Sequence, residues 1–199
     1  MTRLVVATRN RGKLKEIGKL LEAASLSLLP LSDFPDFPDV EEDGATFEEN
    51  AIKKALTAAQ ATGLPALADD SGLVVEALGG RPGVFSARFA GEGSSDDENN
   101  AKLLQELAGM PTGERQAAFR CVIALCLPNG ECRTFEGELH GIILEERRGS
   151  EGFGYDPLFL VPEHGKTLAE LSLEVKNTIS HRGKALESLR EYLFSGIPG

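Results

Sequence analysis

Positive charge is scarce in this chain. It has 21 lysine and arginine residues against 31 aspartate and glutamate residues, so the formal net charge is -10. Wide, non-specific binding to nucleic acid or to an anionic membrane needs a basic surface. We therefore predict neither as a partner. The net negative charge does not exclude binding of a small polyanion in a local basic pocket.

Long apolar runs are also missing. No window approaches the ~18 consecutive apolar residues that a membrane-spanning helix needs. The first seven residues run straight into a short strand pattern and lack the layout of a signal peptide. We therefore expect a cytoplasmic protein. A length of 199 residues with 41% hydrophobic residues suits a single domain, of one or two lobes, with a substantial core.

Cysteine is sparse, and its three positions form no CxxC motif. Cys126 and Cys132 flank a predicted hairpin turn at Asn129-Gly130, a strong signal for a two-residue type I′ turn. With such a turn, Cys126 faces Arg133 rather than Cys132. We therefore expect free and mostly buried thiols.

Two adjacent carboxylates stand at the centre of the pattern that is present. The apolar run 64–68 predicts a buried strand that stops at Asp69-Asp70, and a second apolar run covers 73–78. Carboxylates at the tip of a buried strand are costly unless a partner pairs with them. A divalent cation is one such partner, because it prefers hard carboxylate oxygens. An ordinary turn explains Asp-Asp-Ser-Gly equally well, so both interpretations stay open on this stretch alone.

A small polar loop joins the first predicted strand to the first predicted helix. The strand covers 4–7, the loop runs from Thr8 to Lys13, and the helix that follows has apolar residues at helical spacing. A helix N-terminus with a lysine beside it suits an anion. The spacing is not that of a P-loop. A plain strand-to-helix turn with a solvated lysine is the alternative, and this motif alone favours it.

The next helix is predicted over 47–62, between the capping box at Thr46 and the glycine at Gly63. It follows an acidic cluster at 41–44. A helix of this length can return Glu42 towards Asp70. Lys54 on this helix has no role that its spacing explains. Two long strands, 116–127 and 131–144, form the hairpin, and a last helix follows Ser180.

Two C-terminal segments carry further chemistry. Residues 152–157 form a glycine-flanked turn that offers two aromatic rings, which suits stacking on a planar base, although a tight turn with core aromatics is the alternative. His181 and Arg182 fall at the start of the last helix, where the helix dipole disfavours a cation. Cations placed there point to an anionic or electron-rich partner, and a solvated pair is the alternative.

Six segments, in this order along the chain, resemble the inosine/xanthosine triphosphate pyrophosphatases, which remove deaminated purine nucleotides. The matching segments are Thr8-x-Asn10-x-Gly12-Lys13, Glu42 with Thr46-Phe47-x-Glu49-Asn50-Ala51, Ala68-Asp69-Asp70-Ser71-Gly72-Leu73, Pro82-Gly83-x-x-Ser86-Ala87-Arg88, Gly152-Phe153-Gly154-Tyr155-Asp156-Pro157 and Ser180-His181-Arg182-Gly183-x-Ala185. They cover almost the whole chain and show no departure at a site position.

The resemblance implies an α/β fold with a long, bent mixed sheet and flanking helices. It implies a single two-lobed domain over 1–199, with the nucleotide in the cleft between the lobes, and a homodimer. It also implies Mg²⁺-dependent hydrolysis of ITP, dITP and XTP to the nucleoside monophosphate and pyrophosphate.

The resemblance also implies a role for each matching residue. Glu42 and Asp70 would hold the metal, and Asp70 would activate the attacking water. The residues expected at the phosphates and nearby groups are Thr8, Asn10, Lys13, Ser71 and Lys176, with Gly12 also in the substrate-binding set. Phe153 would stack on the base, and the base pocket would be lined by Gly154, Tyr155, Asp156, His181 and Arg182.

Three alternatives remain at this point. One is a Maf-type pyrophosphatase that takes modified or pyrimidine nucleotides, which the segments at 153–156 and 180–182 argue against. Another is a nucleotide-binding sensor without turnover. The presence of Glu42 and Asp70 argues against it, since a sensor could lose both residues. An aspartyl-phosphate phosphatase built on Asp69-Asp70 ranks last, because the chain lacks the expected DxDx[TV] pattern.

Overall fold

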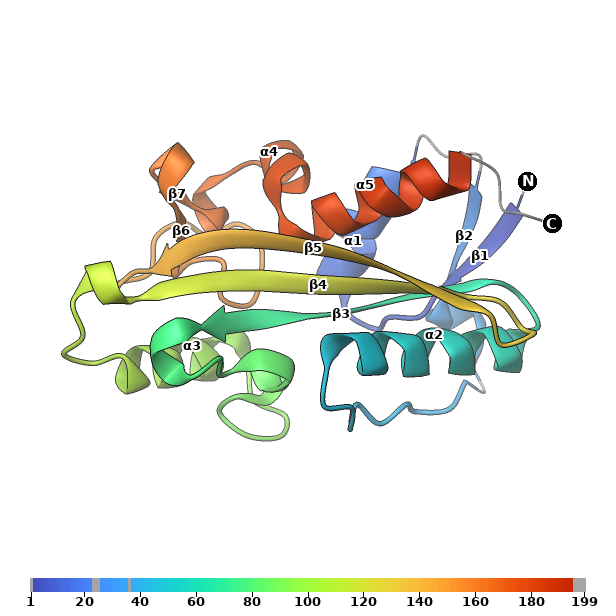
Figure 1. Cartoon of the computed structure of the whole chain (residues 1–199), viewed down its shortest axis with the longest axis horizontal. Coiled ribbons are helices and arrows are strands. Elements are labelled where there is room, and N and C mark those ends of the chain that lie inside the picture. The colour runs from blue at the N-terminus through green and yellow to red at the C-terminus, as the bar shows by residue number, and fades with distance from the viewer. Residues whose placement is uncertain (1, 23–25, 36, 195–199) are drawn as a thin grey trace. The chain divides into compact units, whose positions relative to one another are not determined.

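The computed structural model describes residues 2–22, 26–35 and 37–194 and contains a seven-stranded mixed sheet with the order β2-β1-β3-β4-β5-β6-β7 (Figure 1). The strands are β1 (Thr2–Val6), β2 (Leu26–Pro30), β3 (Ala66–Val75), β4 (Gln116–Cys126), β5 (Cys132–Ile143), β6 (Phe159–Val161) and β7 (Lys166–Thr167). The helices are α1 (Arg11–Leu21), α2 (Phe47–Thr62), α3 (Asp96–Glu106), α4 (Leu173–Ile179) and α5 (His181–Phe194). The predicted α/β class with a mixed sheet and flanking helices is confirmed. The bend of the sheet and the location of the nucleotide stay predictions.

The chain divides into two compact units. The first consists of Met1–Asp70, Cys121–Gly137 and His181–Gly199, and the second of Ser71–Arg120 and Glu138–Ser180. The expectation of one two-lobed domain concerns how these units act together, and it stays a prediction. None of the helices in the described part of the chain is both long enough and apolar enough to span a membrane.

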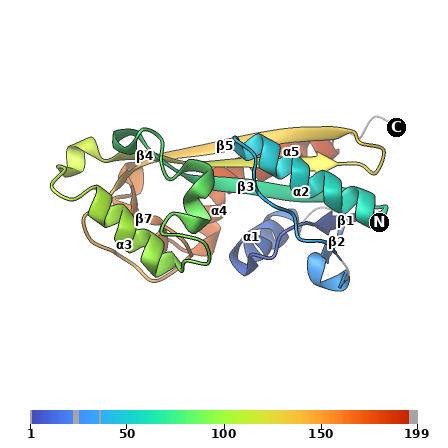
Figure 2. The ribbon, with the colours of Figure 1, turned by 90° about the horizontal axis from the view of Figure 1, so that it is seen from below.

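In the first unit, helices cover both faces of the strands. β1 pairs in parallel with β2 and with β3. Leu67 of β3 joins the apolar cluster that contains residues of α1 and α5, whereas Ala66 and Ala68 join the cluster of α2. Because successive side chains of a strand point to opposite faces, α2 lies on one face and α1 and α5 on the other (Figure 1). Figure 2, in which the chain is seen from below, shows α2 in front of β3.

The predicted limits of α2 are confirmed, because both of its ends carry local signals. The Thr46 side chain accepts a hydrogen bond from the backbone N–H of Glu49, and Gly63 ends the helix in the left-handed conformation with φ +68°. Its buried face is made of alanines, so the helix packs closely on the strands. These alanines are Ala51, Ala55, Ala58 and Ala59.

The second unit has its own core. Leu73 and Val75 of β3 pack there with apolar residues of α3 and of the strands β5 and β6. β6 pairs antiparallel with β5 and with β7. The 3-10 segment η3 (Gly83–Arg88) packs beside α3. The predicted site residues of this unit lie on β3, in the segment between β5 and β6, and on α4.

β3 corrects one prediction. The sequence pattern suggested two strands separated by a turn at Asp69-Asp70, but β3 is a single ten-residue strand that runs through both aspartates. Asp69 is 1% exposed and Asp70 is 5% exposed. Asp69 and Asp70 favour turns, but they can stay in a buried strand when charged side chains form ion pairs with them. Those side chains come from helices outside the strand.

The hairpin between β4 and β5 corrects another prediction. The Leu127 N–H donates to the Glu131 carbonyl at 2.8 Å, and the Gly130 N–H donates to the Leu127 carbonyl at 3.0 Å. The loop therefore has three residues, Pro128 to Gly130, and Gly130 takes the left-handed conformation with φ +98°. This is the common three-residue loop with a bulge, not the predicted two-residue type I′ turn.

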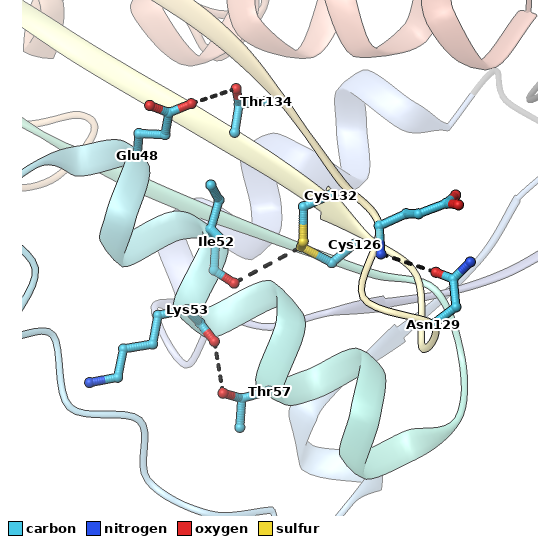
Figure 3. Close-up of a disulfide and its surroundings, with 9 residues drawn as sticks. Glu48, Ile52, Lys53, Thr57, Cys126, Asn129, Cys132 and Thr134 are labelled. Atoms are coloured by element: carbon cyan, nitrogen blue, oxygen red, sulfur yellow. Dashed lines mark hydrogen bonds between the residues drawn. A yellow bond between two sulfur atoms is a disulfide. The ribbon is translucent and has the colours of Figure 1, made fainter.

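The longer loop shifts the strand register by one residue and brings Cys126 opposite Cys132. The two form a disulfide with an S–S distance of 2.03 Å, beside Ile52 of α2 (Figure 3). The expectation of free thiols is therefore wrong for this pair. Cys121 is a free, buried thiol, and burial raises its pKa to about 12.

Candidate active site

The two central aspartates lie on opposite faces of β3. Asp69 follows the direction of Leu67, towards α1 and α5, and Asp70 follows the direction of Ala68, towards α2. Each carboxylate forms ion pairs with different side chains. The two aspartates therefore have different environments although they are adjacent in sequence.

Asp69 is part of a buried charge network with α1 and α5. Its Oδ2 atom lies 3.1 Å from Lys13 Nζ and 3.0 Å from Arg182 Nη2. Arg182 Nη1 also contacts the carboxylate of Glu16, which is 3% exposed. Burial by itself raises the pKa of Asp69, but the charges of Lys13 and Arg182 outweigh it, so this pKa is well below its usual range. Asp69 is therefore a permanently charged residue of the structure.

Close approach of α5 to the sheet makes this network possible. A Cβ atom at Gly137 of β5 would clash with the backbone carbonyl of His181, the first residue of α5. Glycine at this position therefore lets the helix start directly against the strand. His181 is 4% exposed and Arg182 is 1% exposed.

Asp70 faces a second cluster, which comes from α2 and the loop before it. Lys54 Nζ lies 3.3 Å from Asp70 Oδ1 and 2.7 Å from Glu42 Oε1. Asn50 Nδ2 donates to Asp70 Oδ2 at 3.1 Å. Burial raises the pKa of Asp70 above its usual value, although Lys54 and Lys13 act in the opposite direction. The result is a carboxylate that is more basic than an ordinary aspartate.

The same helix fixes the loop that carries Glu42. Asn50 Oδ1 accepts a hydrogen bond from the Gly44 N–H at 2.8 Å, and Glu49 Oε2 accepts one from the Ala45 N–H at 2.7 Å. The prediction that α2 brings Glu42 and Asp70 together is consistent with this geometry, because both carboxylates contact the Lys54 ammonium.

The donors around Lys54 fit a hard divalent cation. A single ammonium group already occupies a position between two carboxylates, Glu42 and Asp70. In the described residues, no group of three or more His, Cys, Asp or Glu side chains gathers as a metal site. Mg²⁺ does not require such a group, because one or two carboxylates and the substrate's phosphates commonly hold it.

The loop between β1 and α1 is ordered by its own side chains. Asn10 Oδ1 caps α1 by accepting the Lys13 N–H at 3.1 Å, and Thr8 Oγ1 accepts the Asn10 N–H at 3.2 Å. Gly12 lies in the first turn of α1. The free N–H groups of a helix N-terminus favour an anion. The side chain of Lys13 lies close to this end, although its ammonium contacts Asp69.

In the second unit, Asp156 organises the turn 152–157. Its Oδ2 atom accepts the Phe153 N–H at 2.9 Å and contacts Lys176 Nζ at 2.6 Å. Gly152 has φ +78°, and a Cβ atom there would clash with this carboxylate. The Lys176 ammonium lies 4.7 Å from the centre of the Phe153 ring, and the Tyr155 hydroxyl donates to the Ser86 carbonyl at 2.8 Å.

The predicted site residues thus fall into two sets. The first unit holds Thr8, Asn10, Gly12, Lys13, Glu42, Asp70, His181 and Arg182, and the second holds Ser71, Phe153, Gly154, Tyr155, Asp156 and Lys176. In the first set the contacts bring together Glu42 with Asp70, through Lys54, and Lys13 with Arg182, through Asp69. In the second set they bring together Phe153, Asp156 and Lys176. Their predicted roles towards a substrate stay predictions.

Sequence reasoning assigned no role to three residues of the first unit that contact these groups. They are Glu16, Asn50 and Lys54. A signal existed for two of them: Asn50 and Lys54 are four residues apart on one helix, so they share a face. Glu16 had no comparable signal, because its partner Arg182 lies on another helix far along the chain.

Comparisons with known proteins agree with this picture. A model of the Ham1 family matches residues 4–192. The chain is 66% identical over 193 residues to a dITP/XTP pyrophosphatase of Geobacter sulfurreducens, with 97% of each chain covered. It is 58% identical over 191 residues to one of Desulforamulus reducens, with 96% of this chain and 95% of the relative covered.

Solved structures give the same result. A HAM1 protein from Coxiella burnetii superposes with a TM-score of 0.90 at 47% identity, over 98% of this chain and 100% of that one. The Ham1 protein of Staphylococcus aureus gives 0.88 at 44% identity, again over 98% and 100%. The family resemblance that the sequence motifs indicated is confirmed. This chain belongs to the Ham1 family.

Proposed function

We propose that this protein hydrolyses deaminated purine nucleoside triphosphates (ITP, dITP and XTP) to the nucleoside monophosphate and pyrophosphate. The observation that carries the reaction type is the pair of carboxylates, Glu42 and Asp70, around one cation position, with a raised pKa at Asp70. The relatives named dITP/XTP pyrophosphatase support the substrate class. The protein is therefore a hydrolase of phosphoric anhydrides.

In this proposal, Glu42 and Asp70 would hold Mg²⁺, with the phosphates of the substrate as further ligands. The chemistry that the ion supplies when bound is neutralisation of the triphosphate and a lower pKa for water in its reach. Asp70 orients the attacking water and accepts its proton, a role for which a raised pKa is favourable. Asn50 and Lys54 keep the Asp70 carboxylate in place during this step.

Phosphate binding is assigned to the end of α1 and to two further side chains. Thr8, Asn10, Gly12 and Lys13 present backbone N–H groups and positive charge, and Ser71 and Lys176 add a hydroxyl and an ammonium. Phosphoryl transfer depends mostly on positioning and on charge stabilisation, so these groups need no covalent chemistry.

Selection of the base follows from hydrogen-bond polarity. Hypoxanthine and xanthine present an acceptor at O6 and a donor at N1, whereas adenine presents a donor at N6 and an acceptor at N1. Donors from His181 or Arg182 and an acceptor from the turn 153–156 would leave adenine opposite unpaired groups. A pocket built on hydrogen bonds can reject the wrong partner by ~10⁴ or more. A homodimer and a cytoplasmic location stay predictions.

Phe153→Ala is expected to raise KM for ITP while kcat changes little. Stacking of one base on one aromatic ring contributes roughly 1–3 kcal/mol, which corresponds to about a 5- to 150-fold change in KM. Steady-state kinetics with ITP measure this effect. Phe85→Ala is the matched control, because it removes a 55% exposed ring of the same unit that has no assigned role. An unchanged KM in Phe153→Ala would make Phe153 a structural residue.

The proposed function is tested by release of pyrophosphate and monophosphate from ITP, XTP, dITP, ATP, GTP and dTTP, with Mg²⁺ and with EDTA. We expect turnover of ITP, XTP and dITP far above ATP and GTP, and its loss in EDTA. Preferred turnover of dTTP would overturn the assignments of Phe153, His181 and Arg182. Nucleotide binding without any turnover would make the protein a sensor.

A further inference from the structure

One glycine in the second unit is held by a helix that has no role so far. The Gly154 N–H donates to Asp96 Oδ2 at 2.7 Å, and the Gly154 carbonyl accepts a hydrogen bond from Asn100 Nδ2 at 2.8 Å. Asp96 and Asn100 lie four residues apart in α3, so they share a face of that helix. Side chains of α3 therefore fix both the backbone N–H and the backbone carbonyl of Gly154.

The geometry of Asn100 leaves its amide only one orientation. Asn100 is 2% exposed, and its Nδ2 atom also donates to the Asp96 carbonyl at 2.6 Å. Both neighbours of Nδ2 are carbonyl oxygens, so a flipped amide would place an oxygen against two acceptors. The start of α3 is itself fixed, because Ser95 and Glu98 form a capping box.

Gly154 stands directly between Phe153 and Tyr155, and its φ of +61° is one that glycine adopts without strain. On the other side, the Phe153 N–H is held by Asp156. The backbone of Phe153 is thus fixed at its own amide by a carboxylate and at the next residue by α3. The direction in which the ring points depends on both anchors.

We propose that Asp96 and Asn100 are positioning residues that set the orientation of the Phe153 ring and thereby the affinity of the enzyme for the base of its substrate. Neither side chain has to touch the substrate. The inference rests on the proposed function at one point, the stacking of Phe153 on the base. It assigns a functional role to α3.

Asn100→Ala is expected to raise KM for ITP by roughly 2- to 12-fold, the change that corresponds to the loss of one hydrogen bond, with kcat changed less than about twofold. The value of kcat/KM for ITP falls by a similar factor. Isothermal titration with IMP gives a second readout, because binding of the product depends on the base site without turnover.

Asn99→Ala is the matched control. Asn99 is the preceding residue of α3 and is 3% exposed. It accepts the Ala90 N–H, in the loop after η3, at 2.8 Å and donates to the Ala87 carbonyl of η3 at 3.2 Å. Asn99→Ala therefore removes a comparable buried amide but leaves the hydrogen bonds to Gly154 in place. We expect it to lower the melting temperature about as much as Asn100→Ala and to keep KM for ITP near the native value.

Two variants of Asp96 separate positioning from charge. Asp96→Asn retains an oxygen that can accept the Gly154 N–H and is expected to keep KM near the native value, whereas Asp96→Ala is expected to raise it. Equal KM values in Asp96→Ala and Asp96→Asn, or the same KM shift in Asn99→Ala as in Asn100→Ala, would overturn the inference.

Phe153→Ala distinguishes this inference from the proposed function. If Phe153→Ala raises KM and Asn100→Ala does not, the base site stands and only the role of α3 is wrong. If Phe153→Ala leaves KM unchanged, the stacking assignment is wrong and the role of α3 fails with it.

Discussion

Asp70→Asn is expected to keep the fold and to bind nucleotide, but to lose turnover by about 10²- to 10⁴-fold, the usual contribution of a positioned general base. The amide has nearly the same shape as the carboxylate, and its oxygen can still accept the hydrogen bond from Asn50. It cannot take a proton from water, and it is a weaker ligand for a divalent ion. Single-turnover kinetics with ITP measure the loss of turnover, and a binding titration with nucleotide measures whether binding is retained.

Asp43→Asn is the control for this experiment. Asp43 lies in the same loop as Glu42 and also pairs with a lysine of α2, at 2.5 Å from Lys53 Nζ, but it is exposed and has no assigned role. We expect its turnover to match the native protein. Near-native turnover in Asp70→Asn would contradict the role of Asp70 as the base. Loss of nucleotide binding together with turnover would make Asp70 a binding residue instead.

Arg182→Met is expected to lower the free energy of unfolding by about 3–5 kcal/mol, the usual effect of removing one partner from a buried ion pair. The guanidinium contacts Asp69 and Glu16, whose side chains are almost completely buried. Without Arg182, Glu16 loses the cation that it contacts and Asp69 keeps only part of its compensation. Urea unfolding followed by circular dichroism measures the difference.

Two other arginine variants make this result specific. Arg190→Met changes a partly exposed arginine of the same helix, which pairs with Glu187 at 2.6 Å, and we expect a loss of at most about 1 kcal/mol. Arg182→Lys keeps the charge but not the planar fork, so an intermediate loss is expected. It also provides a measurable protein if Arg182→Met does not fold. A loss below about 1 kcal/mol in both Arg182 variants would show that the network does not stabilise the fold.

Elements with local signals could be predicted from the sequence. α2 begins at a threonine that caps it and ends at a glycine with positive φ, and both signals lie within a few residues of the helix. The existence of the β4–β5 hairpin was also predicted, because Asn129-Gly130 favours a turn wherever it occurs. Its register was not, since Asn-Gly fits two-residue and three-residue loops alike, and one residue decides whether Cys126 faces Cys132 or Arg133.

The continuity of β3 could not be predicted from nearby residues. Asp-Asp-Ser-Gly has turn propensity, and its stability as part of a strand depends on Lys13, Lys54 and Arg182, which come from three different helices. Tertiary charge pairing here overrides local preference. The candidate site shows the same division: motifs predicted a set of site residues, whereas the contacts that hold them, from Asn50, Glu16 and α3, become visible only in three dimensions.

Asp69 and Asp70 also differ in what natural selection can change. Asp69 serves the stability of the first unit through α1 and α5, whereas Asp70 serves the reaction that we propose, on the face of α2. A descendant of this gene that became a nucleotide-binding protein without turnover could replace Asp70 and remain folded. The same descendant would have to keep Asp69, or replace it together with Lys13 and Arg182. Two neighbouring codons for the same amino acid therefore have separate evolutionary fates, because one strand points their side chains in opposite directions.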